Sequence, residues 1–331
     1  MENLVNSSPL ILVLVFLVIG FAFLMKGADF FVEGSSSIAK RLKVPPIIIG
    51  LTIVAMGTSL PETAVSVTAS LVNNNELAVS NVVGSNIFNL MVVVGVCSIL
   101  TPILVQKETI KRDIPFSMIC AFLLLGLGIL AVGDKSGMTL GHLDGMILLG
   151  FFAGYIVAMI QSAMKARAAG KNVEIEGIEE LEEEIGILSW PKSILFIVGG
   201  ALAIAFGGDL TVDAASRIAI DLGMSQTLIG LTIVSIGTSL PELVTSIVAA
   251  KKDEVDMALG NAIGSNVFNI LMVLGIASVI SPISIIRENI IDLCVLVAFT
   301  VCVWIFAGTK KKIGRIEGLC MVALYAVYAV Y

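Results

Sequence analysis

Charged residues are scarce in this chain of 331 residues, at 14% of the total, whereas 57% of the residues are hydrophobic. A soluble domain carries about 25% charged residues, so this chain lacks the polar surface that water requires and the lipid bilayer is its expected solvent. It has one histidine and no basic patch that would suggest nucleic acid. Its five cysteines all lie in apolar segments, where we expect them to pack as small side chains rather than form disulfides or metal sites. No nucleotide, flavin or haem motif is present, so no cofactor is implied.

Long apolar runs, by contrast, are abundant. A transmembrane helix needs about 20 apolar residues, and this length predicts an all-α integral membrane protein with ten spans. The predicted spans are residues 9–39, 44–71, 77–100, 112–132, 142–164, 190–216, 224–250, 257–280, 289–307 and 314–331.

The distribution of basic residues predicts the orientation of these spans. If the N-terminus lies outside, sixteen Lys and Arg residues fall in inside loops and three in outside loops. This bias follows the positive-inside rule. We therefore expect a multi-pass protein of the plasma membrane with both termini extracellular.

The sequence repeats itself at an offset of 180 residues. GLTIVAMGTSLPET at 50–63 returns as GLTIVSIGTSLPEL at 230–243, and NVVGSNIFN at 81–89 returns as NAIGSNVFN at 261–269. Further along, at an offset of 173, GHLDG at 141–145 matches GRIEG at 314–318. Because each half holds five spans, an odd number, the second half enters the membrane from the opposite side, as in the inverted repeats of secondary transporters. The predicted organisation is a first five-helix repeat at 1–164, an acidic cytoplasmic loop at 165–189 and a second, inverted five-helix repeat at 190–331.

The repeated GTSLPE motif combines a helix breaker with polar groups at membrane depth. Pro61 has no N–H, so the carbonyl group of Gly57 loses its helical partner and the helix bends. Such a carbonyl is tolerated inside a membrane only where it faces a cavity or a ligand. Thr58 and Glu62 are four residues apart and share a helix face. Residues 237–242 repeat the arrangement, so we expect a carboxylate, hydroxyls and free carbonyls from each half to converge.

The second motif adds more oxygen atoms. Ser85 and Asn89 have the same four-residue spacing, and Ser265 and Asn269 mirror them. Carboxylate, hydroxyl and amide oxygens suit calcium, magnesium or sodium rather than zinc or copper. Two bidentate glutamates and two carbonyls would supply about six of the six to eight oxygens that calcium takes.

GTSLPE in both halves, followed by GSNxFN, resembles the two alpha repeats of the calcium/cation antiporter superfamily. The similarity covers nearly the whole chain, and the closest branch is the prokaryotic sodium/calcium exchangers. It implies a central core of broken helices 2, 3, 7 and 8, across which the long helices 1 and 6 slide. In helix 1 we also expect an ion pair between Lys26 and Asp29.

The resemblance further implies a set of ion-binding residues. Glu62 and Glu242 would be central ligands, and Asn89 and Asn269 would fill the remaining central positions. The other implied ligands are the backbone carbonyls of Thr58 and Thr238 and sodium contacts at Ala55, Ser59, Ser85, Ser235, Ser239 and Ser265. Some relatives have aspartate in place of Asn269, so this chain keeps only two carboxylates in the core.

These observations predict a secondary antiporter, and not an enzyme, that exchanges sodium for calcium by alternating access. Calcium and sodium would be its substrates, with no other cofactor, in a monomer surrounded by lipid. The residues leave open an exchanger of calcium, or another divalent cation, for protons, a channel, and a membrane-embedded hydrolase. In the superfamily that the chain resembles, the proton-coupled branch tends to show GNxxE where this chain has GTSLPE, which weighs against proton coupling. Channels usually build their pore from symmetry about the membrane normal, so the inverted repeat weighs against a channel. No nucleophile with a base, and no metal site with histidines, supports a hydrolase.

Overall fold

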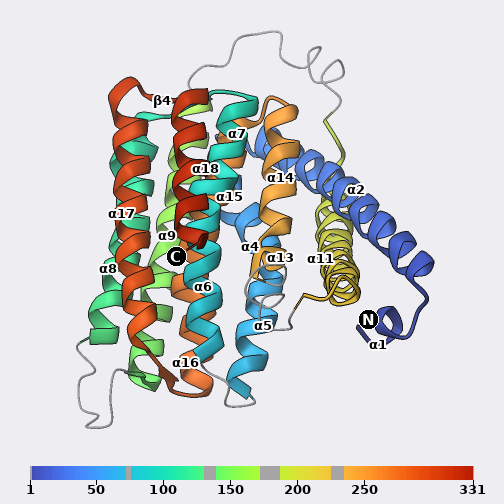
Figure 1. Ribbon diagram of the computed structural model, residues 1–331. Coiled ribbons are helices and arrows are strands. Elements are labelled where there is room, and N and C mark those ends of the chain that lie inside the picture. The colour runs from blue at the N-terminus through green and yellow to red at the C-terminus, as the bar shows by residue number, and fades with distance from the viewer. Residues whose placement is uncertain (1, 72–75, 130–138, 172–186, 225–234, 331) are drawn as a thin grey trace.

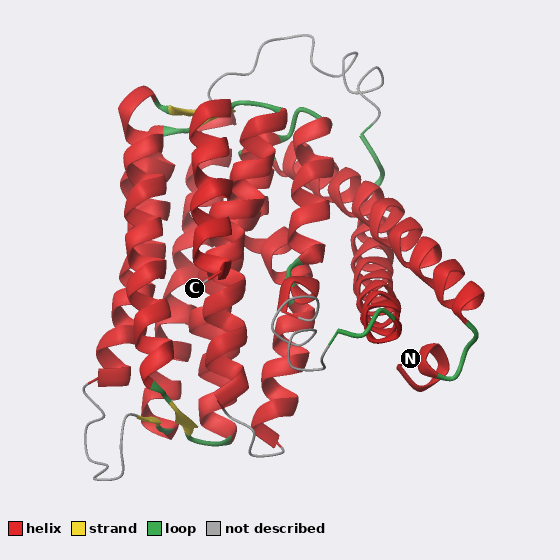
Figure 2. Ribbon diagram, viewed as in Figure 1, coloured by secondary structure: helices red, strands yellow, loops and turns green. Residues whose placement is uncertain are grey.

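The computed structural model describes residues 2–71, 76–129, 139–171, 187–224 and 235–330. Helices make up nearly all of this structure (Figure 2). After the short α1 (Glu2–Asn6), helices occupy the described parts of the ten predicted spans; residues 130–132, 225–234 and 331 of those spans lie outside the described residues. They are α2 (Leu10–Leu42), α3 (Pro46–Ile49) with η1 (Gly50–Val54), α4 (Ala55–Thr58) and α5 (Leu60–Leu71), α6 (Glu76–Phe88) with η2 (Asn89–Val93) and α7 (Val94–Leu100), η3 (Thr109–Asp113) with α8 (Ile114–Ile129), α9 (His142–Lys171), α11 (Trp190–Asp221), α13 (Ser235–Thr238) with α14 (Leu240–Lys251), α15 (Val255–Phe268) with η5 (Asn269–Val273) and α16 (Leu274–Ile280), α17 (Arg287–Lys310) and α18 (Arg315–Val330).

Many of these helices are long enough to cross a membrane. Among the described residues seven helices have the necessary length and apolar character, and an eighth is gained if the bent pair Pro46–Thr58 and Leu60–Thr68 counts as one span. The acidic loop predicted at 165–189 falls mostly on residues 172–186, which lie outside the described residues. The helix before it, α9, continues to Lys171.

The two longest helices, α2 and α11, pack against each other at one side of the bundle (Figure 1). With 33 and 32 residues, each is about 50 Å long at 1.5 Å per residue, so it must tilt to fit a hydrocarbon core of about 30 Å. Glycines allow the two backbones to approach closely. A Cβ atom added at Gly27 would lie 2.9 Å from the carbonyl oxygen of Gly200, and one added at Gly200 would lie 2.7 Å from that of Gly27. Any larger residue at either position would push the helices apart.

A group of charged and polar residues joins α2 to the turn between α14 and α15. Lys252 Nζ lies 3.6 Å from Asp29 Oδ1 and 3.9 Å from Glu33 Oε2. Glu254 lies 3.7 Å from Lys40 Nζ and accepts a hydrogen bond from Ser36. We refer to this group as the α2 ion-pair cluster; its members are Asp29, Glu33, Ser36, Lys40, Lys252 and Glu254.

The predicted ion pair within α2 is confirmed, with Lys26 Nζ 3.7 Å from Asp29 Oδ2. Asp29 also contacts Lys252, which the sequence did not indicate because the two residues are far apart along the chain. The pair therefore belongs to a larger contact between elements.

The predicted interruptions of the second and seventh spans are present. α4 and α5 meet at Ser59 with a bend of 44°, two residues before Pro61. α13 and α14 are likewise interrupted at Ser239, two residues before Pro241. The two prolines thus interrupt the helices where the sequence predicted.

The predicted breaks in the third and eighth spans are wrong. Residues 78–100 and 255–280 each form one continuous helix. Each has a π-helical turn in the middle, η2 beginning at Asn89 and η5 beginning at Asn269. Neither segment contains a proline, so each backbone keeps its ladder of hydrogen bonds and only widens it locally.

Two short antiparallel strand pairs tie the two halves together. β1 (Ile103–Leu104) pairs with β4 (Lys312–Ile313), and β2 (Thr139–Leu140) pairs with β3 (Ile283–Ser284). The register places Ile103 opposite Ile313 and Leu140 opposite Ile283. The offset of 180 relates β1 to β3, and the offset of 173 relates β2 to β4. Each half therefore makes with the other half the same strand contact that it receives from it.

Candidate cation-binding site

Glu62 and Glu242 occupy equivalent positions at the starts of α5 and α14, directly after the two helix breaks. Both side chains are completely buried. The positive end of a helix dipole lies at the first turn of a helix, so each carboxylate lies where negative charge is best tolerated. Among the described residues no group of three or more His, Cys, Asp or Glu is placed to hold a metal ion. A cation centre here therefore depends on two carboxylates and on neutral oxygen atoms.

Each carboxylate accepts a hydrogen bond from a serine hydroxyl group of the other half of the chain. Ser59 Oγ donates to Glu242 Oε1 over 3.3 Å, and Ser239 Oγ donates to Glu62 Oε1 over 3.5 Å. The second oxygen, Oε2, of each glutamate is buried and has no hydrogen-bond partner in the described part of the chain. Ser239 and Ser59 are themselves fully buried. Both carboxylates thus keep one oxygen available to a ligand.

The GSN segment of the second half completes the surroundings of Glu242. Ser265 Oγ donates to Glu242 Oε1 over 3.4 Å. The hydroxyl of Thr58 lies 3.4 Å from Ser265 Oγ and 3.0 Å from Asn261 Oδ1. Oxygen atoms from α4, α14 and α15 therefore meet at one buried point.

The equivalent residues of the first half have related contacts. Thr238 Oγ1 donates to Asn81 Oδ1 over 3.3 Å, matching the contact between Thr58 and Asn261. Asn81 Nδ2 donates to Ser66 Oγ over 3.4 Å, as Asn261 Nδ2 does to Ser246 Oγ over 3.0 Å. The hydroxyl of Ser85 is buried without a hydrogen-bond partner among the described atoms.

Asn81 and Asn261 are residues that the sequence prediction missed. They open the NVVGSN and NAIGSN segments and recur at the same offset as the glutamates. That recurrence was a usable signal. The structure gives it a reason, since each asparagine orients the threonine of the other half.

Four more asparagines form a network between α6 and α15. Asn86 Nδ2 donates to the backbone carbonyl of Asn266 over 3.1 Å, and Asn266 Nδ2 donates to that of Asn86 over 3.1 Å. Asn89 Nδ2 donates to Asn266 Oδ1 over 3.3 Å, and Asn269 Nδ2 donates to Asn86 Oδ1 over 3.1 Å. The Oδ1 atoms of Asn89 and Asn269 are buried and have no partner in the described structure.

The remaining predicted residues are placed as follows. Ala55 is fully buried at the start of α4, and its carbonyl accepts the backbone N–H of Ser59 over 3.0 Å. Ser235 begins α13, but its side chain lies outside the described part of the chain. Ligation through the backbone carbonyls of Thr58 and Thr238 stays a prediction.

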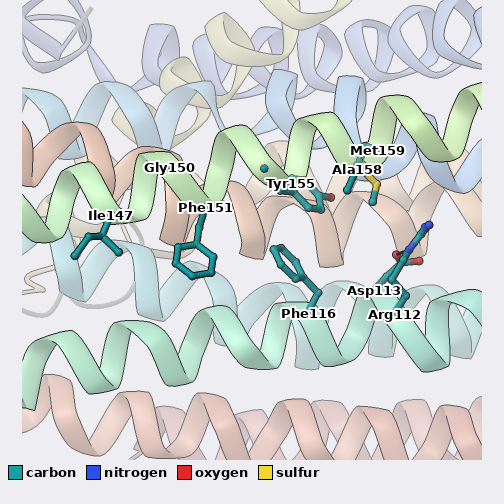
Figure 3. Close-up of a pocket in the computed structure, with 10 residues that line it drawn as sticks. Arg112, Asp113, Phe116, Ile147, Gly150, Phe151, Tyr155, Ala158 and Met159 are labelled. Carbon is teal, nitrogen blue, oxygen red and sulfur yellow. Dashed lines mark hydrogen bonds and ion pairs between the residues drawn. The ribbon is translucent and has the colours of Figure 1, made fainter.

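A groove of about 580 Å³ lies between α8 and α9, lined mostly by apolar side chains (Figure 3). The rings of Phe116 and Tyr155 stack there with centroids 5.3 Å apart. Tyr155 donates its hydroxyl to the carbonyl of Leu51 in η1 over 2.9 Å. None of the predicted ion-binding residues that the structure describes lines this groove.

Comparisons with known proteins identify the family of the chain. The family model described as "Sodium/calcium exchanger protein" matches residues 12–161 and 192–331. The putative antiporter CaxA of Alkalimonas amylolytica is 38% identical over 328 residues, covering 95% of this chain and 96% of that protein. The sodium/calcium exchanger MaX1 of Methanosarcina acetivorans is 33% identical over 338 residues, covering 95% and 96%.

Solved structures of the sodium-calcium exchanger NCX_Mj also match. One of them, soaked with 100 mM Na⁺ and 10 mM Sr²⁺, superposes with a TM-score of 0.81 at 32% identity and covers 97% of this chain and 99% of that one. These relatives are membrane transporters and not enzymes. The chain described here shares their multi-pass helical architecture.

Proposed function

Because the chain belongs to the sodium/calcium exchanger protein family, we propose that it exchanges sodium for calcium across the plasma membrane at a site built on Glu62 and Glu242. The observation that carries the proposal is the crossed pair of contacts, in which each buried carboxylate is held by a serine from the other half and keeps one oxygen that has no partner among the described residues. Each half of the chain thereby supplies one carboxylate and one serine to the same centre. Calcium and sodium are the substrates of that centre.

The charge of the centre explains why cargo is needed. Two ionised carboxylates buried inside a membrane without compensation cost at least several kcal/mol. One calcium ion or two sodium ions would neutralise Glu62 and Glu242. An empty centre would keep its charge and resist closure, so the transporter cycles only with an ion bound, which is the origin of obligatory exchange.

The spacing of the oxygens supports a cation of this size. Two ligands at right angles around an ion with Ca–O distances of about 2.4 Å are about 3.4 Å apart. The separations at the centre are 3.3 Å between Ser59 and Glu242, 3.4 Å between Ser265 and Glu242, and 3.5 Å between Ser239 and Glu62. These hydrogen bonds are longer than ordinary O–H···O hydrogen bonds of about 2.7–2.8 Å, so the hydroxyls hold the carboxylates loosely and are spaced closely enough to act as neighbouring ligands of one ion. Thr58, Thr238, Ser85, Asn89 and Asn269 would complete its surroundings.

The proposed mechanism uses a ten-span inverted repeat. Residues 1–164 and 190–331 would form the two five-helix units, joined by the acidic cytoplasmic loop 165–189, with both termini outside. The exchange of equivalent strand pairs and hydrogen bonds between the halves supports this arrangement. α2 and α11 would slide across the core to open the centre to either side. Because one chain contains the whole centre, a monomer suffices.

The test is sodium-driven calcium uptake. The full-length protein is reconstituted into proteoliposomes loaded with sodium and diluted into sodium-free medium that contains ⁴⁵Ca²⁺. We expect calcium to enter while the sodium gradient lasts and to stop entering when gramicidin dissipates it.

A proton gradient of equal size, in sodium-free liposomes, is the matched control. Uptake that follows the proton gradient and ignores sodium would identify a calcium/proton exchanger and contradict the proposal. Uptake down the calcium gradient that persists when neither a sodium nor a proton gradient is present would indicate a channel.

A further inference from the structure

The asparagine network between α6 and α15 fixes which atom each amide presents. Asn266 Nδ2 contacts the backbone carbonyl of Asn86 at 3.1 Å, and a carbonyl can only accept. The atom of Asn266 on the opposite side is therefore its oxygen. That oxygen lies 3.3 Å from the amide of Asn89, so Asn89 must donate through Nδ2.

The same logic holds in the other direction. Asn86 Nδ2 donates to the carbonyl of Asn266, which leaves Asn86 Oδ1 to accept from Asn269 Nδ2. In both halves the orientation of the last amide follows from a backbone carbonyl, whose role cannot change. The oxygen atoms of Asn89 and Asn269 are thereby turned away from the network.

These two oxygens are buried acceptors without a partner in the described structure. A buried polar atom in that state costs about 1–3 kcal/mol, so a ligand that supplies positive charge would relieve it. Asn269 follows Ser265 by one helical turn on the same face, and Ser265 contacts Glu242. The unpartnered oxygen of Asn269 therefore belongs to the face of the continuous α15–η5 helix that carries Ser265 and borders Glu242.

We propose that Asn86 and Asn266 are positioning residues, each of which holds the amide of the ligand asparagine in the other half so that its oxygen, and not its N–H group, faces the cation. This inference rests on the proposed function. Asn266 acts on Asn89, and Asn86 acts on Asn269. Without these hydrogen bonds, the side-chain amide of Asn89 or Asn269 could rotate and present its two N–H donors to the cation. These donors would repel the cation.

The crossed arrangement gives a test that a merely structural role does not satisfy. Equilibrium binding of ⁴⁵Ca²⁺ to the purified full-length protein in detergent is measured for single and double substitutions to leucine, which has nearly the shape of asparagine. We expect N89L and N266L each to weaken binding about tenfold, the equivalent of about 1.4 kcal/mol. The double variant should bind within about twofold of N89L, because Asn266 acts through Asn89.

The matched control is the pair within one half, N86L with N89L. These two residues act on different ligand oxygens, so their effects should nearly multiply, to about a hundredfold. Serine replaces leucine at any position where the leucine variant does not fold, and thermal unfolding is recorded for every variant.

Equal behaviour of the crossed and same-half pairs would overturn the inference. So would unchanged calcium binding in N266L. The proposed function is judged separately with E62Q and E242Q. If those variants bind calcium like the wild type, the proposed centre itself is wrong, whereas their failure to bind together with no crossed coupling would reject only the positioning role.

Discussion

Glu62 and Glu242 are each held by a hydroxyl group that belongs to the other half of the chain. A glutamine has the shape of a glutamate and still offers an oxygen to that hydroxyl, but it carries no charge. Replacing one glutamate therefore tests the charge of the centre while disturbing its packing very little.

We expect E62Q and E242Q each to reduce sodium-dependent calcium uptake to the level of protein-free liposomes, because one carboxylate cannot balance a divalent ion. Thermal unfolding of the purified variants should remain cooperative. The control is D292N in α17, a carboxylate that accepts a hydrogen bond from Tyr328 over 2.9 Å and does not contact the centre. Wild-type uptake in either glutamine variant would rule out the proposed centre.

At this scale the sequence indicated the two acidic residues but not the contacts that hold them. The equivalent, buried positions of Glu62 and Glu242 could be predicted because each follows a proline and recurs at a fixed offset. The contacts of Asn81, Asn86 and their counterparts could not, because spacing along a helix reveals neighbours on the same face only. The partners of these asparagines come from the other half of the chain.

At the scale of the elements, the packing of α2 against α11 leaves no room for an added side chain where the two helices meet. Their backbones touch at Gly27 and Gly200, where an added methyl group would lie within 3 Å of a carbonyl oxygen. The neighbouring Gly199 has open space around its Cβ position. An added methyl group therefore fits at Gly199 but not at Gly200, although the two glycines are adjacent in α11.

We expect G200A to lower the free energy of unfolding by about 1–3 kcal/mol through overpacking. G199A should leave it unchanged or raise it by up to about 1 kcal/mol, because alanine favours a helix more than glycine does. Chemical or thermal unfolding in detergent measures both. Equal stability of the two variants would contradict the close approach.

The interruptions of the second and seventh spans could be predicted because proline removes a backbone donor. The π-helical turns at Asn89 and Asn269 could not, because such a turn requires no proline or glycine and its extra residue is accommodated by packing. Where the sequence has a proline the predicted break is correct, and where only the family resemblance predicted a break the helix is widened instead.

At the scale of the whole molecule, the α2 ion-pair cluster makes the two halves of the chain unequal. It joins α2 to Lys252 and Glu254. At an offset of 180 the first half has Val72 and Asn74 at these positions, neither of which is charged. If the two halves exchange roles during transport, this cluster stabilises one of the two end states, because the positions equivalent to Lys252 and Glu254 carry no charge in the first half.

We expect K252Q to raise the rate of calcium exchange about two- to fivefold, with calcium affinity unchanged within about twofold. The side chains of the cluster are partly exposed, and exposed ion pairs contribute only about 0.2–1 kcal/mol each. High ionic strength should speed the wild type and have less effect on K252Q. The control is R217Q, which removes the pair between Arg217 and Asp221 inside α11. A rate that falls with K252Q, or that changes equally with R217Q, would contradict a role for the cluster in holding one state.

The crossed hydroxyl contacts also bear on how the protein is made. While the ribosome is still translating the second half, Glu62 has already been inserted into the bilayer and Ser239 does not yet exist. The newly made first half must therefore wait with an unsupported acid in lipid, either protonated or sheltered by the insertion machinery. A chain truncated before residue 239 would keep that acid without the hydroxyl group of Ser239.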